Sequence, residues 1–230
     1  MRYQHGNPDS PDRDRIIISK GHATMGLYPI FADLGYFDPA ELEAYGSFDG
    51  QLRIFGNIDI PGVDATSGSL GHGLGVGIGY ALAAKLDNSP SRTYVIVSEG
   101  EMYEGSIWES ALFASQHELD NLVVILDRNR KIILGDTEEL VGLEPVEEKW
   151  RSFGFETQRV DGHSIADLYE AFQSTLKTKN KPHLIVADTV KGKGIPLMEN
   201  EPSWHYWQSM TSETKEEIRL LLEKAEQSAS

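Results

Sequence analysis

Short apolar runs of strand length alternate with amphipathic stretches of helix length along most of the chain. Residues 93–97 and 122–126 are rich in β-branched side chains, which is typical of buried strands. Between them, apolar residues at helical spacing predict a helix over about residues 104–117. A strand, a helix and a second strand in this order predict a parallel βαβ unit.

The same alternation continues on both sides of this unit, without a linker or an internal repeat. Residues 1–15 are polar and predict an irregular lead-in. The pattern then predicts further strands at residues 16–18, 155–160 and 183–189, and helices within residues 19–34, 68–86, 146–153, 164–176 and 211–227. We therefore expect one α/β domain over residues 1–230, doubly wound around a mostly parallel sheet.

Composition narrows the classes of function. The chain has 230 residues, is 40% hydrophobic, contains no cysteine and carries a net charge of −15. A charge of this sign argues against nucleic acid or an anionic membrane as a partner. The absence of cysteine excludes disulfides and thiolate metal sites. With no run long enough to span a membrane and no apolar leader, we expect a cytoplasmic protein.

Polar residues follow both strands of the βαβ unit at their carboxyl ends. Glu99, Gly100 and Glu101 follow the first strand, and Asp127 and Asn129 end the second. In parallel sheets these ends meet at one edge, where α/β proteins collect ligand groups. Carboxylate and carboxamide oxygens beside a glycine suit a hard cation and a diphosphate. The alternative is an ordinary βαβ unit with exposed acids, and the spacing alone does not separate the two.

Longer segments resemble a known family. EGEMYEGSIWES and LDNLVVILDRN, about thirty residues apart, resemble the thiamine diphosphate signature in its transketolase version. PDRDRIIISKGHA, PGVDATSGSLGHGLG and KGKGIPLMENEPSWH also resemble transketolase segments in the same order. The chain is therefore similar to the N-terminal, diphosphate-binding subunit of a split transketolase, which implies a thiamine diphosphate-binding fold.

The resemblance also implies roles for individual residues. It implies a divalent cation, Mg²⁺ or else Ca²⁺ or Mn²⁺, on Glu99, Asn129 and the Lys131 carbonyl. It implies contacts to thiamine diphosphate from His22, Gly68, Ser69, Leu70, Gly100, Glu101, Asn129 and His205. It implies a catalytic group of His22, His205, Asn57 and Glu104, with Glu104 linked to the opposite subunit. For Glu104, a solvated residue at a helix start is an equally sufficient interpretation.

Two positions depart from the family pattern. Glu99 stands where the family has Asp, and the extra methylene moves the carboxylate outward, although Mg²⁺ demands near-ideal geometry at about 2.1 Å. Asn57 stands near a substrate-contacting His of the family, and it keeps hydrogen-bonding capacity but cannot carry a proton charge. Lys191 and Lys193 form a basic loop that could close over a phosphate group.

The resemblance implies transfer of a two-carbon ketol unit from a ketose or ketose phosphate to an aldose acceptor. It also implies a transferase that is active only with a C-terminal-type partner subunit bearing the pyrimidine domain, in an α2β2 assembly. Two alternatives stay open. One is another thiamine diphosphate enzyme subunit, of a 2-oxoacid dehydrogenase, a decarboxylase or a natural-product two-carbon transferase. The other is a non-catalytic binding subunit, which the changes at Glu99 and Asn57 favour.

Overall fold

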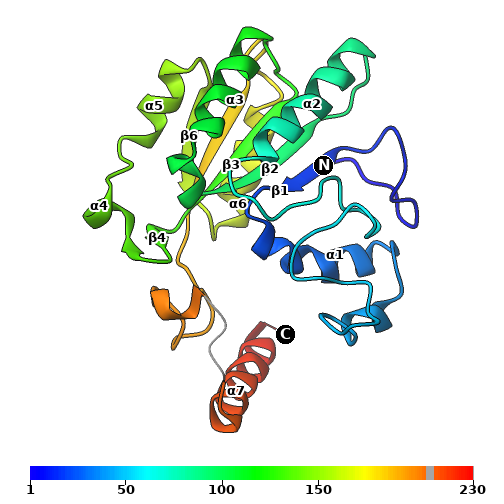
Figure 1. The fold of residues 1–230 in the computed structure, drawn as a ribbon, viewed down its shortest axis with the longest axis vertical. Helices are drawn as coiled ribbons and strands as arrows, with labels where there is room; N and C mark the ends of the chain where they lie inside the picture. The colour runs from blue at the N-terminus through cyan, green and yellow to red at the C-terminus, as the bar shows by residue number, and fades with distance from the viewer. Residues whose placement is uncertain (206–209, 230) are drawn as a thin grey trace.

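A parallel sheet forms the centre of the protein (Figure 1). The computed structural model describes residues 1–205 and 210–229. Within them, a five-stranded sheet has the order β1-β2-β3-β7-β6, and every pairing in it is parallel. Its strands are β1 (Arg15–Ile18), β2 (Thr93–Ser98), β3 (Leu122–Arg128), β6 (Glu156–Asp161) and β7 (His183–Asp188). The predicted α/β class and parallel sheet are confirmed.

The α-helices of the described chain fall on the predicted helical stretches, except for the short α4, which was not predicted. Short 3-10 helices connect several of these elements. The α-helices are α1 (Tyr28–Asp33), α2 (Gly73–Leu86), α3 (Gly105–Gln116), α4 (Thr137–Leu140), α5 (Val146–Ser152), α6 (Ile165–Ser174) and α7 (Ser212–Ala229). Four 3-10 helices are η1 (Gly21–Leu27), η2 (Pro39–Leu42), η3 (Gly100–Tyr103) and η4 (Pro202–His205) within the described chain. A hairpin of β4 (Lys131–Ile132) and β5 (Gly135–Asp136) follows β3. The pattern did not predict this hairpin, because two-residue strands are too short to show periodicity.

Both faces of the sheet are covered, as expected for a doubly wound fold. Alternate residues of a strand point to opposite faces. Val95 and Val97 belong to the larger apolar cluster, which also contains buried residues of α2, α3 and α5. Tyr94 belongs to a smaller cluster with Val123 and with Ala171 of α6. The fully buried runs in β2 and β3 are therefore the centre of the fold.

A third cluster attaches the long loop after α1 to the body. It consists of Tyr28, Phe31, Tyr36, Leu52 and Ile60, all at most 8% exposed. The loop thus carries its own apolar contacts, although no strand or α-helix forms between residues 43 and 72 of the described chain.

A buried ion pair fixes the end of the same loop. The Asp64 carboxylate accepts from Arg13 at 2.6 Å and from the Ile16 backbone N–H at 3.0 Å. Because Ile16 belongs to β1, this contact ties the loop to the edge of the sheet.

The C-terminal helix α7 lies apart from the sheet in Figure 1. Neither this helix nor any other in residues 1–205 and 210–229 combines the length and apolar character needed to cross a membrane.

Candidate functional site

A cavity of about 690 Å³ opens at the carboxyl edge of the sheet. Because the strands are parallel, the segments that follow β1, β2, β3 and β7 meet there. Six of the predicted site residues line the cavity, together with Lys20, Asp127, Thr189 and Lys191: they are His22, Leu70, Gly100, Asn129, Lys131 and His205. The structure therefore brings residues distant in the sequence to one concave site.

Lysine side chains supply positive charge on one side of this cavity. The Lys20 ammonium donates to the Asp127 carboxylate, which also accepts from the Thr189 hydroxyl. Burial opposes the charged form of Asp127, but the contacts with Lys20 and Thr189 outweigh it and lower its pKa. Burial and the nearby Lys20 lower the pKa of Lys191 from its ordinary value near 10.5. Lys20 is thus paired, whereas Lys191 faces the cavity from the loop after β7.

The two predicted histidines lie together. The ring centroids of His22 and His205 are 5.4 Å apart. Burial, followed by the charge of Lys191, lowers the pKa of His205 to about 4. Burial and the charge of Lys20 also lower the pKa of His22. His205 is therefore neutral at pH 7, and the depressed pKa of His22 favours its neutral form too, so they offer ring N–H groups as donors while the lysines carry the charge.

Glu99 is buried at the end of β2, with 1% of its surface exposed. Its Oε1 accepts from the Arg130 backbone N–H at 2.5 Å and lies 3.0 Å from Arg128 Nη1. Its Oε2 is also buried and has no hydrogen-bond partner among the described residues. Burial raises the pKa of Glu99, although Arg130 and Arg128 act in the opposite direction.

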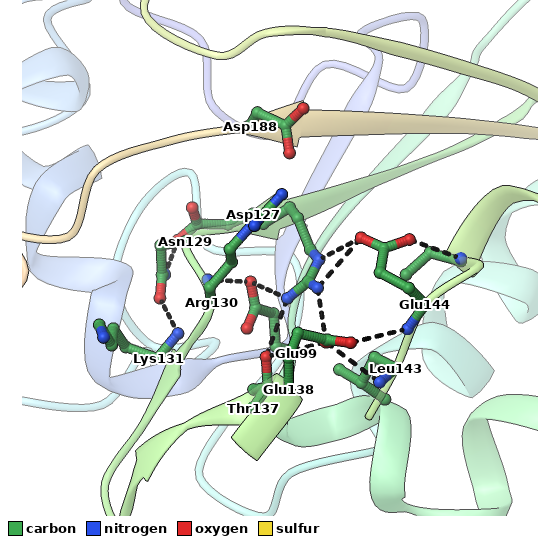
Figure 2. Close-up of polar contacts among 12 residues, drawn as sticks. Glu99, Asp127, Asn129, Arg130, Lys131, Thr137, Glu138, Leu143, Glu144 and Asp188 are labelled. Atoms are coloured by element: carbon green, nitrogen blue, oxygen red, sulfur yellow. Dashed lines mark hydrogen bonds and ion pairs between the residues drawn. The ribbon is translucent and has the colours of Figure 1, made fainter. Parts of the chain in front are cut away.

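Arg128 connects Glu99 to two further acids, Glu138 and Glu144. Figure 2 shows these three acids close together. The Arg128 side chain is fully buried, and it pairs with Glu138 at 2.7 Å and Glu144 at 3.1 Å. Burial opposes the charge on Glu144, but hydrogen bonds from the Val146 N–H, Arg159 and Arg128 lower its pKa to about 2. The Arg128 guanidinium therefore faces three carboxylates in the part of the chain that the structure describes, and Arg159 also pairs with one of them, Glu144.

The three predicted cation ligands, Glu99, Asn129 and Lys131, are close to the hydrogen bond between the Arg130 backbone N–H and Glu99. Arg130, which donates to Glu99, stands between Asn129 and Lys131 in the sequence. The Asn129 Oδ1 accepts from the Lys131 N–H at 3.0 Å. Within residues 1–205 and 210–229, no three His, Asp or Glu side chains gather in a way that could hold a metal. A cation here would depend on one carboxylate, one carboxamide and a backbone carbonyl.

These residues fit such a cation through one oxygen. A buried carboxylate oxygen without a partner is costly, and a cation would satisfy it. Glu99 Oε2 is such an atom, while Oε1 is already engaged by Arg130 and Arg128.

Glu101, predicted to contact the cofactor, is fully buried and does not line the cavity. Its carboxylate accepts from the Gly71 N–H at 3.0 Å, the Ser98 N–H at 2.8 Å and the Ser19 hydroxyl. It therefore joins the end of β2 to the segments around Ser19 and Gly71. Gly71 has φ +81°, and an added Cβ would lie 2.6 Å from the Ser106 hydroxyl, so this contact requires glycine.

Five other predicted residues lie outside the cavity lining: Asn57, Gly68, Ser69, Glu99 and Glu104. Asn57 bonds within its own loop, donating to Asp59 at 2.9 Å and accepting from Thr66 at 3.2 Å. Glu104 is exposed at the N-cap of α3, and its side chain caps no backbone N–H there. Their roles toward a cofactor, a substrate or a partner stay predictions.

Sequence reasoning missed Lys20, Arg128 and Thr189 as members of the site. Each lies within two residues of the end of a parallel strand, at Ile18, Arg128 and Asp188. Their position at strand ends was a usable signal, but their partners could not be read from the sequence.

Comparison with known proteins agrees with this architecture. A family model described as the thiamine diphosphate binding domain of transketolase matches residues 1–222. The chain belongs to this family. The resemblance of the sequence to transketolase is therefore confirmed over nearly the whole chain.

Two relatives are named as subunits. An apulose-4-phosphate transketolase subunit of Phocaeicola vulgatus is 38% identical over 98% of this chain and 80% of its own length. The 6-deoxy-6-sulfo-D-fructose transketolase subunit SqwG of Clostridium sp. is 37% identical over 94% of this chain and 82% of its own length. A transketolase structure from Pichia stipitis, complexed with sedoheptulose 7-phosphate, has a TM-score of 0.84 at 28% identity. The match includes 95% of this chain but only 34% of the length of that transketolase.

Proposed function

We propose that the chain is the diphosphate-binding subunit of a thiamine diphosphate-dependent transketolase. It would transfer a two-carbon ketol unit from a ketose donor to an aldose acceptor. The observation that carries this proposal is that Lys20, Lys191, His22 and His205 line the same cavity as Asn129. Such a set of cations and neutral donors suits a diphosphate, which an acidic chain would otherwise repel.

Thiamine diphosphate, when bound, supplies the chemistry that breaks and forms the carbon–carbon bond. The residues of this chain would hold and orient it. We propose that Lys191 and the two histidine N–H groups contact its phosphate oxygens, and that the backbone at Gly68 and Gly100 approaches it closely. Leu70, Ser69 and Glu101 would support it from the adjacent loops. A divalent cation, Mg²⁺ by preference, would lie on Glu99 Oε2, Asn129 and the Lys131 carbonyl.

Catalysis would need a second polypeptide. The described chain spans about a third of the solved transketolases it matches, and two relatives are named as one subunit of a transketolase. We infer that a C-terminal-type subunit completes the enzyme in an α2β2 assembly in the cytoplasm, with exposed Glu104 facing it. Asn57 would take the substrate-side position. Because the two subunit relatives are named for a phosphorylated and a sulfonated sugar, we propose a donor that carries an anionic group.

The test is activity on reconstitution. The full chain, mixed with the candidate partner subunit, thiamine diphosphate and Mg²⁺, should transfer the ketol unit from a ketose phosphate to an aldose phosphate, measured by product chromatography. Neither of the two polypeptides should be active by itself. Release of CO2 from pyruvate, with no transfer from any ketose phosphate, would instead indicate another thiamine diphosphate enzyme.

Calorimetry separates catalysis from binding. The full chain should bind thiamine diphosphate in the presence of Mg²⁺, and His205→Ala should weaken that binding by removing a donor next to His22. An absence of binding at millimolar cofactor, with and without the partner subunit, would favour a non-catalytic binding subunit.

A further inference from the structure

Glu99 and Arg128 form the feature at this edge that the established chemistry of the fold does not account for. Both side chains are buried, and the guanidinium lies 3.0 Å from Glu99 Oε1. A fixed cation beside an expected cation ligand would normally weaken the site, because it neutralises part of the charge that attracts the metal.

The contact affects the two carboxylate oxygens unequally. Oε1 receives the Arg130 N–H and faces Arg128, whereas Oε2 is buried and unpartnered among the described residues. Rotation of the carboxylate about its last bond would break both contacts on Oε1. Glu99 is thus held with one oxygen occupied and with the other buried and unpartnered among the described residues.

Arg128 is itself held in place from several sides. It donates to Thr137 at 3.0 Å and Glu138 at 2.7 Å, and to Glu144 at 3.1 Å through Nη2. These contacts fix the plane of the guanidinium, and a buried side chain in such a network has little freedom to move away from Glu99.

We propose that Arg128 is a positioning residue that sets the cation preference of this site. Together with the Arg130 backbone N–H it occupies Glu99 Oε1, which leaves the carboxylate only Oε2 for a cation. Mg²⁺ and Mn²⁺ accept one carboxylate oxygen in a compact octahedral shell, whereas Ca²⁺ is larger and also accepts both oxygens of one carboxylate. The pair therefore favours the smaller ions and offsets the longer reach of Glu compared with Asp. This inference rests on the proposed function, because it assumes that a cation binds here with thiamine diphosphate.

The test measures cation selectivity instead of turnover. MgCl2 and CaCl2 are titrated separately into the full chain with saturating thiamine diphosphate, and heat is recorded by calorimetry. The unmodified protein should bind Mg²⁺ at least tenfold more tightly than Ca²⁺. In Arg128→Lys, one ammonium cannot contact Glu99, Glu138 and Glu144 together, so Glu99 Oε1 loses its charged partner and keeps only the Arg130 backbone N–H. The ratio of the Ca²⁺ to the Mg²⁺ dissociation constant should then fall at least tenfold.

Glu138→Gln is the matched control, because Glu138 touches Arg128 but makes no contact with Glu99 in the described structure. It should change thermal stability while leaving the selectivity ratio within about twofold. If Arg128→Lys weakens both cations equally, or if the unmodified protein prefers Ca²⁺, the proposed role of Arg128 is wrong. Arg128→Gln serves as a second variant should the lysine variant fail to fold. If the unmodified protein binds no cation with thiamine diphosphate present, the proposed function itself fails.

Discussion

The ends of β1 and β7 present lysine and histidine side chains to the cavity, whereas the ends of β2 and β3 bury acids around one arginine. In the first region, Lys20 and Lys191 line the cavity and the pKa of each histidine is lowered. In the second, Glu99 and Arg128 are 1% exposed. The same sheet edge thus holds accessible positive charge next to buried, partly compensated negative charge. A diphosphate and a metal ion require this division, since each binds charge of the opposite sign.

Removal of the buried arginine should have the largest effect on stability. Arg128→Met keeps an apolar stem but leaves Glu99 buried without its charged partner. We expect the free energy of unfolding to fall by about 3–5 kcal/mol, measured by urea denaturation. Adding Glu99→Gln to this variant should recover part of the loss.

Arg219 in α7 provides the matched surface control. It pairs with Glu216 at 2.7 Å, but both side chains are 55% exposed. Arg219→Met should therefore leave the free energy of unfolding nearly unchanged. Equal losses in the Arg128 and Arg219 variants would contradict the contrast between the buried and exposed pairs.

Substitutions in the cavity should change the affinity for thiamine diphosphate instead of the free energy of unfolding. Lys191→Met removes a cavity-facing ammonium and should weaken thiamine diphosphate binding about tenfold, or about 1.4 kcal/mol. Lys193→Met is its control, because Lys193 is 54% exposed and lies 3.8 Å from Glu199. Calorimetry in the presence of Mg²⁺ measures the affinity of both variants for thiamine diphosphate. The idea fails if the two variants lose the same affinity.

The smallest expected effect concerns Glu144, at the outer end of the acidic network. Its pKa is lowered to about 2, so its contribution to stability is complete above pH 4.5 and is lost as pH falls toward 2. Because the side chain is 34% exposed, solvent screening reduces this contribution to about 1 kcal/mol. Glu144→Gln should cost that amount at pH 7.

The pH dependence gives the check on Glu144. Urea denaturation of the unmodified protein and Glu144→Gln should give curves that converge between pH 4.5 and pH 2. A difference that stays constant over this range would show that the carboxylate charge is not what stabilises the network.

Periodicity predicted the sheet because its central strands are buried on both faces. Residues such as Val95 and Val124 lie in continuous apolar runs, and these runs carry a strong signal. The β4–β5 hairpin carried none, yet it includes Lys131, one of the proposed cation ligands. The fold was therefore easier to predict than the local geometry of the site.

Six of the residues that the resemblance predicted for the site line the cavity, but the resemblance did not predict what each one touches. His22 and His205 do lie together in the cavity. The Glu101 carboxylate, by contrast, accepts from Ser19, Gly71 and Ser98, and Asn57 bonds within its own loop. Arg128 could not be found in advance, because a guanidinium buried beside an acid depends on contacts between the ends of two different strands. Hydrogen-bond partners of this kind arise only from tertiary packing.

The contacts of Glu101 have a consequence for how a ligand enters. One carboxylate fixes the backbone around Ser19, Gly71 and Ser98, which come from three distant parts of the chain. A ligand would therefore bind next to backbone that is already in its final position, so binding would cost little conformational entropy. Structures with and without a ligand should consequently superpose closely at Ser19, Gly71 and Ser98. Any slow conformational step in ligand binding should arise elsewhere.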